Sequence, residues 1–226
     1  MDRTFLTILL VSVGILSSCR NEEEKKNKGH IYAKYTIWGE EGKELVNAFF
    51  QFQSGGPDGT TLLLNKPAKV LLDNHLLIAD SAKETGVFYE LQIPVEDFEG
   101  PHTITFTDAD KKEYTQNFSF TRFRLRNEID GRLNRSEMVL HVEGLEDNTP
   151  VRVVITDTTV EGDGINEMDT VRNKQLDLRK FLRAVSNGPI NLHLYKEEER
   201  LLNSESSGWG EISITYGLKR EFELKD

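Results

Sequence analysis

Arginines at alternate positions stand near the middle of the chain. Arg122, Arg124 and Arg126 are separated by the apolar residues Phe123 and Leu125. In a β-strand, three guanidinium groups at this spacing share one face. Guanidinium groups bind carboxylates and sulfates through paired hydrogen bonds, as an acidic glycan would offer. Pairing with glutamates of a neighbouring strand or domain is the alternative, and it is favoured because surface ion pairs are common.

Two tryptophans are candidates for contact with sugar rings. Trp38 precedes Gly39, and Trp209 lies between Gly208 and Gly210. Aromatic side chains exposed beside glycine-rich loops can form flat binding platforms. The alternative is packing in the core or at its rim, where most tryptophans lie. Trp209 is the better candidate, because it has a glycine on both sides.

The segment 161–169 concentrates oxygen-bearing side chains around two glycines. Asp163, Asn166 and Asp169 are weak candidates for calcium ligands, since a hard cation takes oxygen ligands. Their spacing differs from that of an EF-hand loop, and a solvated acidic hairpin is the favoured interpretation. We expect no other metal site and no cofactor.

Catalytic patterns are not found in the sequence. It contains no Gly-x-Ser-x-Gly elbow, no phosphate-binding glycine loop and no His-Glu-x-x-His motif. Its five histidines occur singly, at positions 30, 75, 102, 141 and 193. The 38 acidic residues allow many carboxylate pairs by chance, and no pair stands out. We therefore predict a protein without catalytic residues.

Three tripeptides resemble the O-glycosylation motif of exported Bacteroidetes proteins. They are Asp80-Ser81-Ala82, Asp157-Thr158-Thr159 and Asp169-Thr170-Val171. The resemblance implies that Ser81, Thr158 and Thr170 carry glycans at exposed positions. Composition alone would give about one such match.

The N-terminus resembles that of a bacterial lipoprotein. An apolar run from Phe5 to Ile15 is too short to cross a bilayer, and it is followed by Leu16-Ser17-Ser18-Cys19, which is similar to a lipobox. The resemblance implies a signal peptide over 1–18 that is cleaved before Cys19. It also implies that Cys19 carries a diacylglycerol and a further acyl chain such as palmitate, which together make a stable membrane anchor.

The residues after Cys19 predict a disordered tether over 19–30. Residues 20–29 include no apolar side chain, so they have nothing to bury. Glu22, Glu23 and Glu24 resemble the surface-export signal of Bacteroidetes lipoproteins; a generic solvated tether is the alternative. The lipobox resemblance implies a lipid-anchored protein of the outer membrane, and the export-signal resemblance implies exposure at the cell surface.

Alternation of apolar and polar residues predicts an all-β fold for the rest of the chain. A short helical pattern covers only 177–185. The predicted strands are 31–38, 46–53, 59–64, 68–73, 86–93, 102–107, 113–120, 122–127, 137–143, 150–157, 174–178, 189–196 and 210–224. Short strands at this spacing are typical of β-sandwiches. Residues 103–110 also resemble the late hairpin of bacterial Ig-like and PKD-like domains.

A change in alternation phase predicts a domain boundary near Thr121. Phe118 and Phe120 occupy even positions, whereas Phe123 and Leu125 occupy odd ones. A shift of one residue turns side chains to the opposite face, which requires a bulge or a new domain. We predict two tandem Ig-like β-sandwich domains, 31–121 and 122–226, with a stiff junction.

Composition excludes some classes of binding partner. The net charge of −10 argues against nucleic acid or an anionic lipid surface as a partner, and the single cysteine leaves no disulfide. We expect a lipid-anchored envelope protein with a non-catalytic binding or structural role, attached to the membrane by its lipid. The alternatives are a glycan-binding accessory protein of a polysaccharide-uptake system, or a subunit of a surface fibre or conjugation-type assembly that contacts an envelope protein.

Overall fold

The computed structural model describes residues 31–126, 129, 131–157, 164–183, 185–204 and 208–226. Nearly all of these residues lie in strands or the turns between them, so the predicted all-β class is confirmed. The strands are β1 (Ile31–Glu40), β2 (Leu45–Ser54), β3 (Thr60–Thr61), β4 (Lys69–Leu72), β5 (His75–Leu76), β6 (Ala79–Ala82), β7 (Gly86–Pro94), β8 (Gly100–Thr107), β9 (Glu113–Phe120), β10 (Arg124–Leu125), β11 (Arg132–Asn134), β12 (Val139–Glu143), β13 (Pro150–Asp157), β14 (Ile165–Thr170), β15 (Gln175–Asp177), β16 (Gly188–Ser204) and β17 (Gly208–Lys225). The helices are the 3₁₀ turn η1 (Arg135–Glu137) and α2 (Arg179–Leu182).

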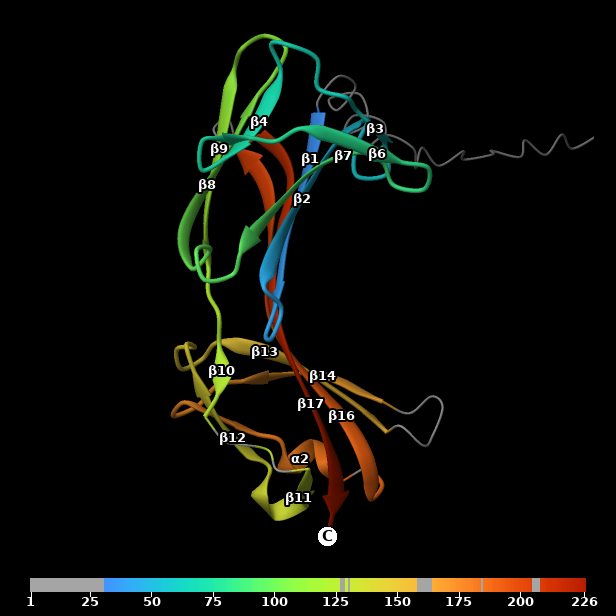
Figure 1. The fold of residues 1–226 in the computed structure, drawn as a ribbon, viewed down its shortest axis with the longest axis vertical. Coiled ribbons are helices and arrows are strands. Elements are labelled where there is room, and N and C mark those ends of the chain that lie inside the picture. Colours follow the sequence, from blue (N-terminus) through green and yellow to red (C-terminus); the bar gives the residue numbers. More distant parts are fainter. Residues whose placement is uncertain (1–30, 127–128, 130, 158–163, 184, 205–207) are drawn as a thin grey trace, which may run out of the picture.

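One long sheet runs through the molecule in the order β14-β13-β16-β17-β1-β2-β7-β6. Its centre is the hairpin of β16 and β17, which pair from Gly188–Leu224 to Ser204–Gly208. The first half of β17 pairs in parallel with β1, and the first half of β16 pairs with β13. The hairpin therefore belongs to both ends of the elongated molecule (Figure 1).

Two smaller sheets, β5-β4-β8-β9 and β10-β12-β15, cover the same side of the long sheet (Figure 1). Even-numbered side chains of β17 face them, including the buried Ile212, Ile214 and Leu218. The layers touch where the Phe52 and Phe106 rings pack with centroids 4.5 Å apart. Each small sheet and the part of the long sheet beneath it form a two-layer sandwich, so the opposite side of the long sheet is left open.

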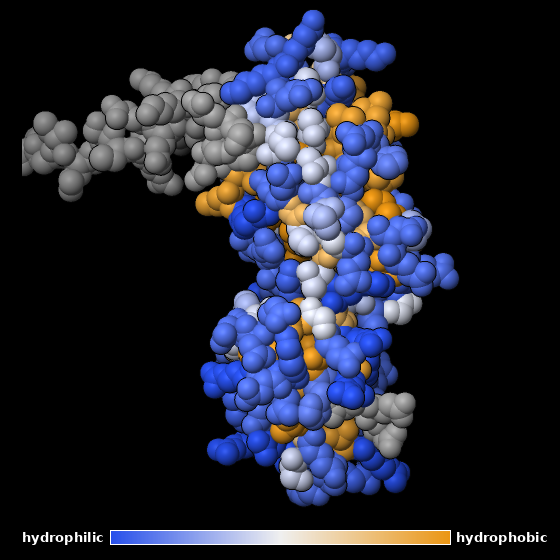
Figure 2. Space-filling view, turned by 90° about the vertical axis from the view of Figure 1, so that its left-hand side faces the viewer, coloured by the Kyte–Doolittle hydropathy of each residue, from blue (hydrophilic) through white to orange (hydrophobic). Residues whose placement is uncertain are grey.

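The strand pairing divides the chain differently from the predicted ranges. We call residues 31–121 with 196–217 the N-terminal unit, and residues 122–195 with 218–226 the C-terminal unit. The predicted ranges 31–121 and 122–226 placed the whole hairpin in the second domain. Because β1 pairs with residues 209–217 of β17, the N-terminal unit is completed by the end of the chain. Figure 2 shows the two units as upper and lower masses separated by a narrower waist.

The phase change predicted near Thr121 is present. Phe118, Phe120 and Phe123 are all buried, and no strand is assigned between Phe120 and Arg124. Tyr216 of β17 contacts both sides of this crossing, with its ring 5.9 Å from Phe120 and 5.7 Å from Phe123. The two cores are thus continuous through the junction.

Candidate functional site

Both tryptophans lie on the open side of the long sheet. Lys34, Thr36 and Trp38 alternate along β1 with the buried residues of the core, so they face outward. Tyr32 has the same phase, but it is buried, with 5% of its surface exposed. Tyr32 pairs in register with Trp209 of β17, which puts Trp209 on that same face. Trp38 is six residues from Tyr32, so the two indoles are about 20 Å apart along the strand.

Trp209 is held at one end of this face by Tyr32. The two rings meet edge to face, with centroids 5.1 Å apart and planes at 89°. The Tyr32 hydroxyl donates a hydrogen bond to Oε2 of Glu211 at 2.9 Å. Burial, together with this hydrogen bond, raises the pKa of Tyr32 to about 12. The tyrosine therefore stays protonated and fixes one side of the indole.

Trp38 lies at the other end with 38% of its surface exposed. Its ring centroid is 5.8 Å from that of Tyr195 on β16. The hydroxyl of Tyr195 is 3.0 Å from Nδ1 of His193. Trp38 thus presents a ring to solvent while a neighbouring aromatic restricts its position.

A shallow groove of about 520 Å³ lies on this face, beside the part of β1 that separates the two tryptophans, and neither indole is part of its lining. Its wall includes Lys34 and Thr36 of β1, Glu211 and Ser213 of β17, and Leu201 of β16. Lys34 and Glu211 form an ion pair at 3.1 Å. Aromatic rings at both ends with hydroxyl and charged groups between them suit an extended ligand that has apolar ring faces and hydroxyl groups. We call these residues the open-face site.

The arginines lie away from the open-face site and are paired with glutamates. Arg122 donates to Oε2 of Glu99 through Nε at 2.9 Å and Nη2 at 2.6 Å. Arg124 lies 2.6 Å and Arg126 3.8 Å from oxygens of Glu143. Arg122 and Arg124 line a depression at the junction together with Tyr216, whose side chain points to the covered side of the sheet. This is the pairing with glutamates that the sequence favoured, and the arginines do not join the tryptophans.

The described members of the candidate calcium site do not converge. Asn166 and Asp169 both lie in β14, and a separation of three residues puts them on opposite faces of the strand. Oδ1 of Asn166 accepts a hydrogen bond from Arg152 at 3.3 Å. Oδ1 of Asp169 accepts one from Lys180 at 2.8 Å. Each oxygen already contacts a cationic side chain, and Asp163 lies outside the described residues. No group of three metal-ligating side chains occurs in the described parts of the chain.

The candidate modification sites differ in exposure. Ser81 is exposed in the edge strand β6, where its backbone N–H donates to Oδ1 of Asp80 at 2.6 Å. Thr170 is half-buried at the end of β14. Thr158 and Cys19 lie outside the described residues.

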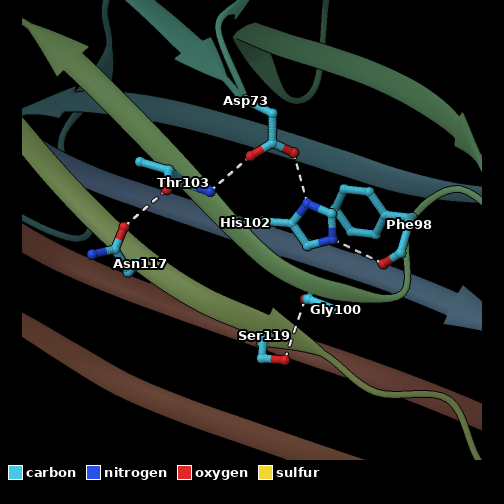
Figure 3. A network of polar contacts seen from close by, with 7 residues as sticks. All are labelled: Asp73, Phe98, Gly100, His102, Thr103, Asn117 and Ser119. Atoms are coloured by element: carbon cyan, nitrogen blue, oxygen red, sulfur yellow. Dashed lines mark hydrogen bonds and ion pairs between the residues drawn. The ribbon is translucent and has the colours of Figure 1, made fainter.

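A buried histidine is the main polar feature that the sequence interpretation missed. His102 of β8 lies between Oδ2 of Asp73, 2.6 Å from Nδ1, and the carbonyl oxygen of Phe98, 2.9 Å from Nε2 (Figure 3). Its ring also stacks on that of Phe98, with centroids 3.8 Å apart. The other oxygen of Asp73 accepts the backbone N–H of Thr103 at 2.8 Å. The signal was present in the sequence, since His102 shares its phase with the core residues of the same strand.

Comparisons with known proteins give little further information. No protein-family model and no curated protein matches the sequence. Among solved structures, the chain is similar to one described as "Crystal structure of DIP-gamma IG1+IG2", at 10% identity and a TM-score of 0.23, over 86% of this chain and 95% of that one. We draw no conclusion from a likeness at that score. No helix within the described residues is long and apolar enough to cross a membrane.

Proposed function

We propose that this protein is a lipid-anchored, non-catalytic binding protein of the cell envelope that binds a glycan at the open-face site. The observation that carries the proposal is the register between β1 and β17, which sets Trp38 and Trp209 on one solvent-facing surface, with a groove beside the part of β1 that separates them. Sugar rings present apolar faces to indoles and hydroxyl groups to polar side chains. An open sheet surface with spaced aromatic rings suits a chain of such rings better than a compact small molecule, which needs an enclosed pocket.

The attachment to the envelope rests on the lipobox-like segment that ends at Cys19. Two or more acyl chains on this cysteine would hold the protein durably on a membrane. The outer membrane is the proposed location, with the cell surface as its outward face. The polar residues 20–29 would then act as the tether between the lipid and β1.

Affinity electrophoresis against a panel of neutral and acidic polysaccharides tests the binding proposal. We expect retardation by at least one neutral polysaccharide, and a loss of affinity of about tenfold for Trp38→Ala, equivalent to about 1.4 kcal/mol. Trp209→Ala is expected to weaken binding as well, but its ring also packs on Tyr32, so Trp38→Ala is the cleaner variant. Met168→Ala is the matched control, because Met168 is 49% exposed on β14 of the C-terminal unit. Binding to no polysaccharide of the panel, or equal binding by wild type and both tryptophan variants, would overturn the proposal.

A role in a surface assembly has less support. Beyond Tyr195, residues 196–204 of β16 pair with β17 alone among the described strands, so they form a sheet edge that could accept another strand. That edge begins with the charged run Lys196-Glu-Glu-Glu-Arg200, in which Glu198 is ion-paired with both Lys196 and Arg200. Charged side chains on an edge oppose strand addition. The glycan proposal is therefore the one that the geometry favours.

A further inference from the structure

A second groove opens at the opposite edge of the N-terminal unit. It has a volume of about 690 Å³, and it is lined by Leu64, Lys66, Pro67, Lys69, Leu76 and Ile78 together with their neighbours. Leu76 is 60% exposed and Ile78 is 80% exposed. Leu63, which is 55% exposed, is the residue before Leu64. We call this surface the apolar groove; hydrophobic surface at the margin of the upper unit is visible in Figure 2.

The apolar groove has a rigid floor and an open rim. Among the described strands, β5 pairs only with β4 and β6 only with β7, so the chain crosses from one sheet to the other at Leu77 and Ile78. Leu77 and Tyr89 are 4% and 3% exposed and form part of the floor. The Tyr89 hydroxyl accepts a hydrogen bond from the backbone N–H of Leu64 at 2.6 Å, which fixes the segment on the other side. Ile78 therefore projects from a well-ordered base and is not part of a poorly packed core.

Both charged residues that line the apolar groove are cationic. Lys66 and Lys69 form no ion pair with any residue that the structure describes. A ligand complementary to the apolar groove has an apolar part that contacts the groove and anionic groups that the ammonium groups of the two lysines can reach. Phospholipid, with acyl chains below phosphate groups, has this arrangement.

The apolar groove also lies near the start of β1. Ile31 pairs with Ser54, which in turn pairs with Thr60, three residues before Leu63. Cys19 precedes Ile31 by 12 residues, a distance of at most about 40 Å in extended chain. A lipid on Cys19 can therefore reach a bilayer that touches this end of the protein.

We propose that the apolar groove docks on the phospholipid bilayer in which the protein is anchored. Leu76 and Ile78 enter the boundary between headgroups and acyl chains, while Lys66 and Lys69 bind headgroup phosphates. Phosphate is present in zwitterionic as well as anionic lipids, so the local contact does not require an anionic membrane, which the net charge of the protein opposes. The inference rests on the proposed anchor at Cys19.

Docking at this edge would keep the open-face site accessible. The strand order places β6 at one edge of the N-terminal unit, and the groove of the open-face site is built from β16, β17 and β1 toward the other edge. A second copy of this chain suits the apolar groove less well. A two-fold contact would bring Lys66 and Lys69 of one copy close to the same lysines of the other, which is unfavourable.

The test uses the full lipid-anchored protein in vesicles, with an environment-sensitive fluorophore on an introduced cysteine. Ile78→Cys reports on the apolar groove, and Leu201→Cys is the matched control because Leu201 is 75% exposed on β16. The only native thiol is that of Cys19, which lipidation blocks. The vesicles contain phosphatidylcholine, alone or in equal parts with phosphatidylglycerol, together with a lipid that carries a quencher on its acyl chain.

We expect the lipid-borne quencher to reduce emission at position 78 at least about twofold more than at position 201 in both kinds of vesicle. Lys66→Glu combined with Lys69→Glu is expected to remove most of this difference. Equal quenching at the two positions overturns docking. A blue shift of the fluorophore at position 78 in concentrated protein without vesicles also overturns it, because that shift would indicate contact with a second copy of the chain. Mass spectrometry of the same protein reports lipidation of Cys19 separately, so failure of the anchor and failure of docking are distinguishable.

Discussion

Nδ1 of His102 lies 2.6 Å from Oδ2 of Asp73, and the same imidazole reaches the carbonyl oxygen of Phe98 through Nε2. A carbonyl oxygen can only accept, so Nε2 must carry the proton of that hydrogen bond. The histidine thereby joins the turn after β4 to the loop before β8, within a site where its side chain is only 8% exposed. These contacts hold the smaller sheet of the N-terminal unit together at one end.

Replacing His102 by leucine removes both hydrogen bonds and leaves Asp73 and the Phe98 carbonyl without this partner. We expect the free energy of unfolding to fall by about 2–3 kcal/mol, because hydrogen bonds to charged groups and unsatisfied buried acceptors both contribute. Urea denaturation followed by circular dichroism measures the change. His75→Gln is the control, since His75 is exposed in β5 and its replacement should change stability by less than about 0.5 kcal/mol. Equal losses in the two variants would contradict the assigned role of His102.

Alternation allowed most strands of the chain to be predicted, but not all of them. β14 was interpreted as an acidic loop because it contains few apolar residues and includes Asn166, Glu167 and Asp169. The second half of β16 was missed for the same reason: the run from Lys196 to Arg200 does not alternate. Both segments are edges with a solvated side, where the burial that produces alternation is weak.

The open-face site could be predicted only in part. That Tyr32 and Trp38 share a face follows from their spacing on one strand. That Trp209 joins them depends on a parallel pairing between β1 and β17, which are almost the whole chain apart. No local pattern specifies such a register, because it is set by packing of the completed sheet. The same long-range pairing explains why the predicted ranges of the two domains left out the strands that complete the first.

Removing the hydroxyl of Tyr32 should change how stability depends on pH. The pKa of Tyr32 is raised from 10 to about 12, mainly by burial, so the unfolded chain loses this proton at lower pH than the folded one. Stability from this group is therefore complete below about pH 10 and is lost as pH rises toward 12. Tyr32→Phe should lower stability at neutral pH through loss of the bond to Glu211, but flatten its decline above about pH 10. Urea midpoints between about pH 8 and 11 measure both effects; parallel curves for wild type and variant would contradict the prediction. Burial also raises the pKa of Tyr35, so some decline should remain in Tyr32→Phe.

The exposed arginines should contribute little to either stability or glycan binding. Arg124 and Arg126 are 73% and 77% exposed, and both lie close to Glu143. Exposed pairs typically contribute less than about 1 kcal/mol. We expect the double variant Arg124→Ala with Arg126→Ala to unfold within about 1 kcal/mol of wild type, and to be retarded equally by the polysaccharide that wild type binds. Selective loss of binding to acidic polysaccharides would instead assign recognition to the arginines and count against the open-face site.

Gly210, the residue after Trp209, has no room for a side chain against β1. A Cβ added to Gly210 would lie 1.9 Å from the carbonyl oxygen of Ala33, and the backbone φ of Gly210 is +156°. Neither strand can move aside easily, because Ala33 and Gly210 are paired in the middle of the long sheet. We expect Gly210→Ala to lower the free energy of unfolding by about 3 kcal/mol, as overpacking against rigid neighbours does. It should also weaken glycan retention, since the displaced strand carries Trp209.

Gly131→Ala is the matched control for this prediction, because a Cβ at Gly131 would meet no atom within 4 Å and its φ is not in the left-handed region. Chemical denaturation of both variants decides the question, together with affinity electrophoresis of whichever remain folded. If Gly210→Ala is as stable as Gly131→Ala and binds as wild type does, the parallel pairing of β1 with β17 is not the contact that brings Trp209 and Trp38 onto one face. The open-face site would then lose the register on which it depends.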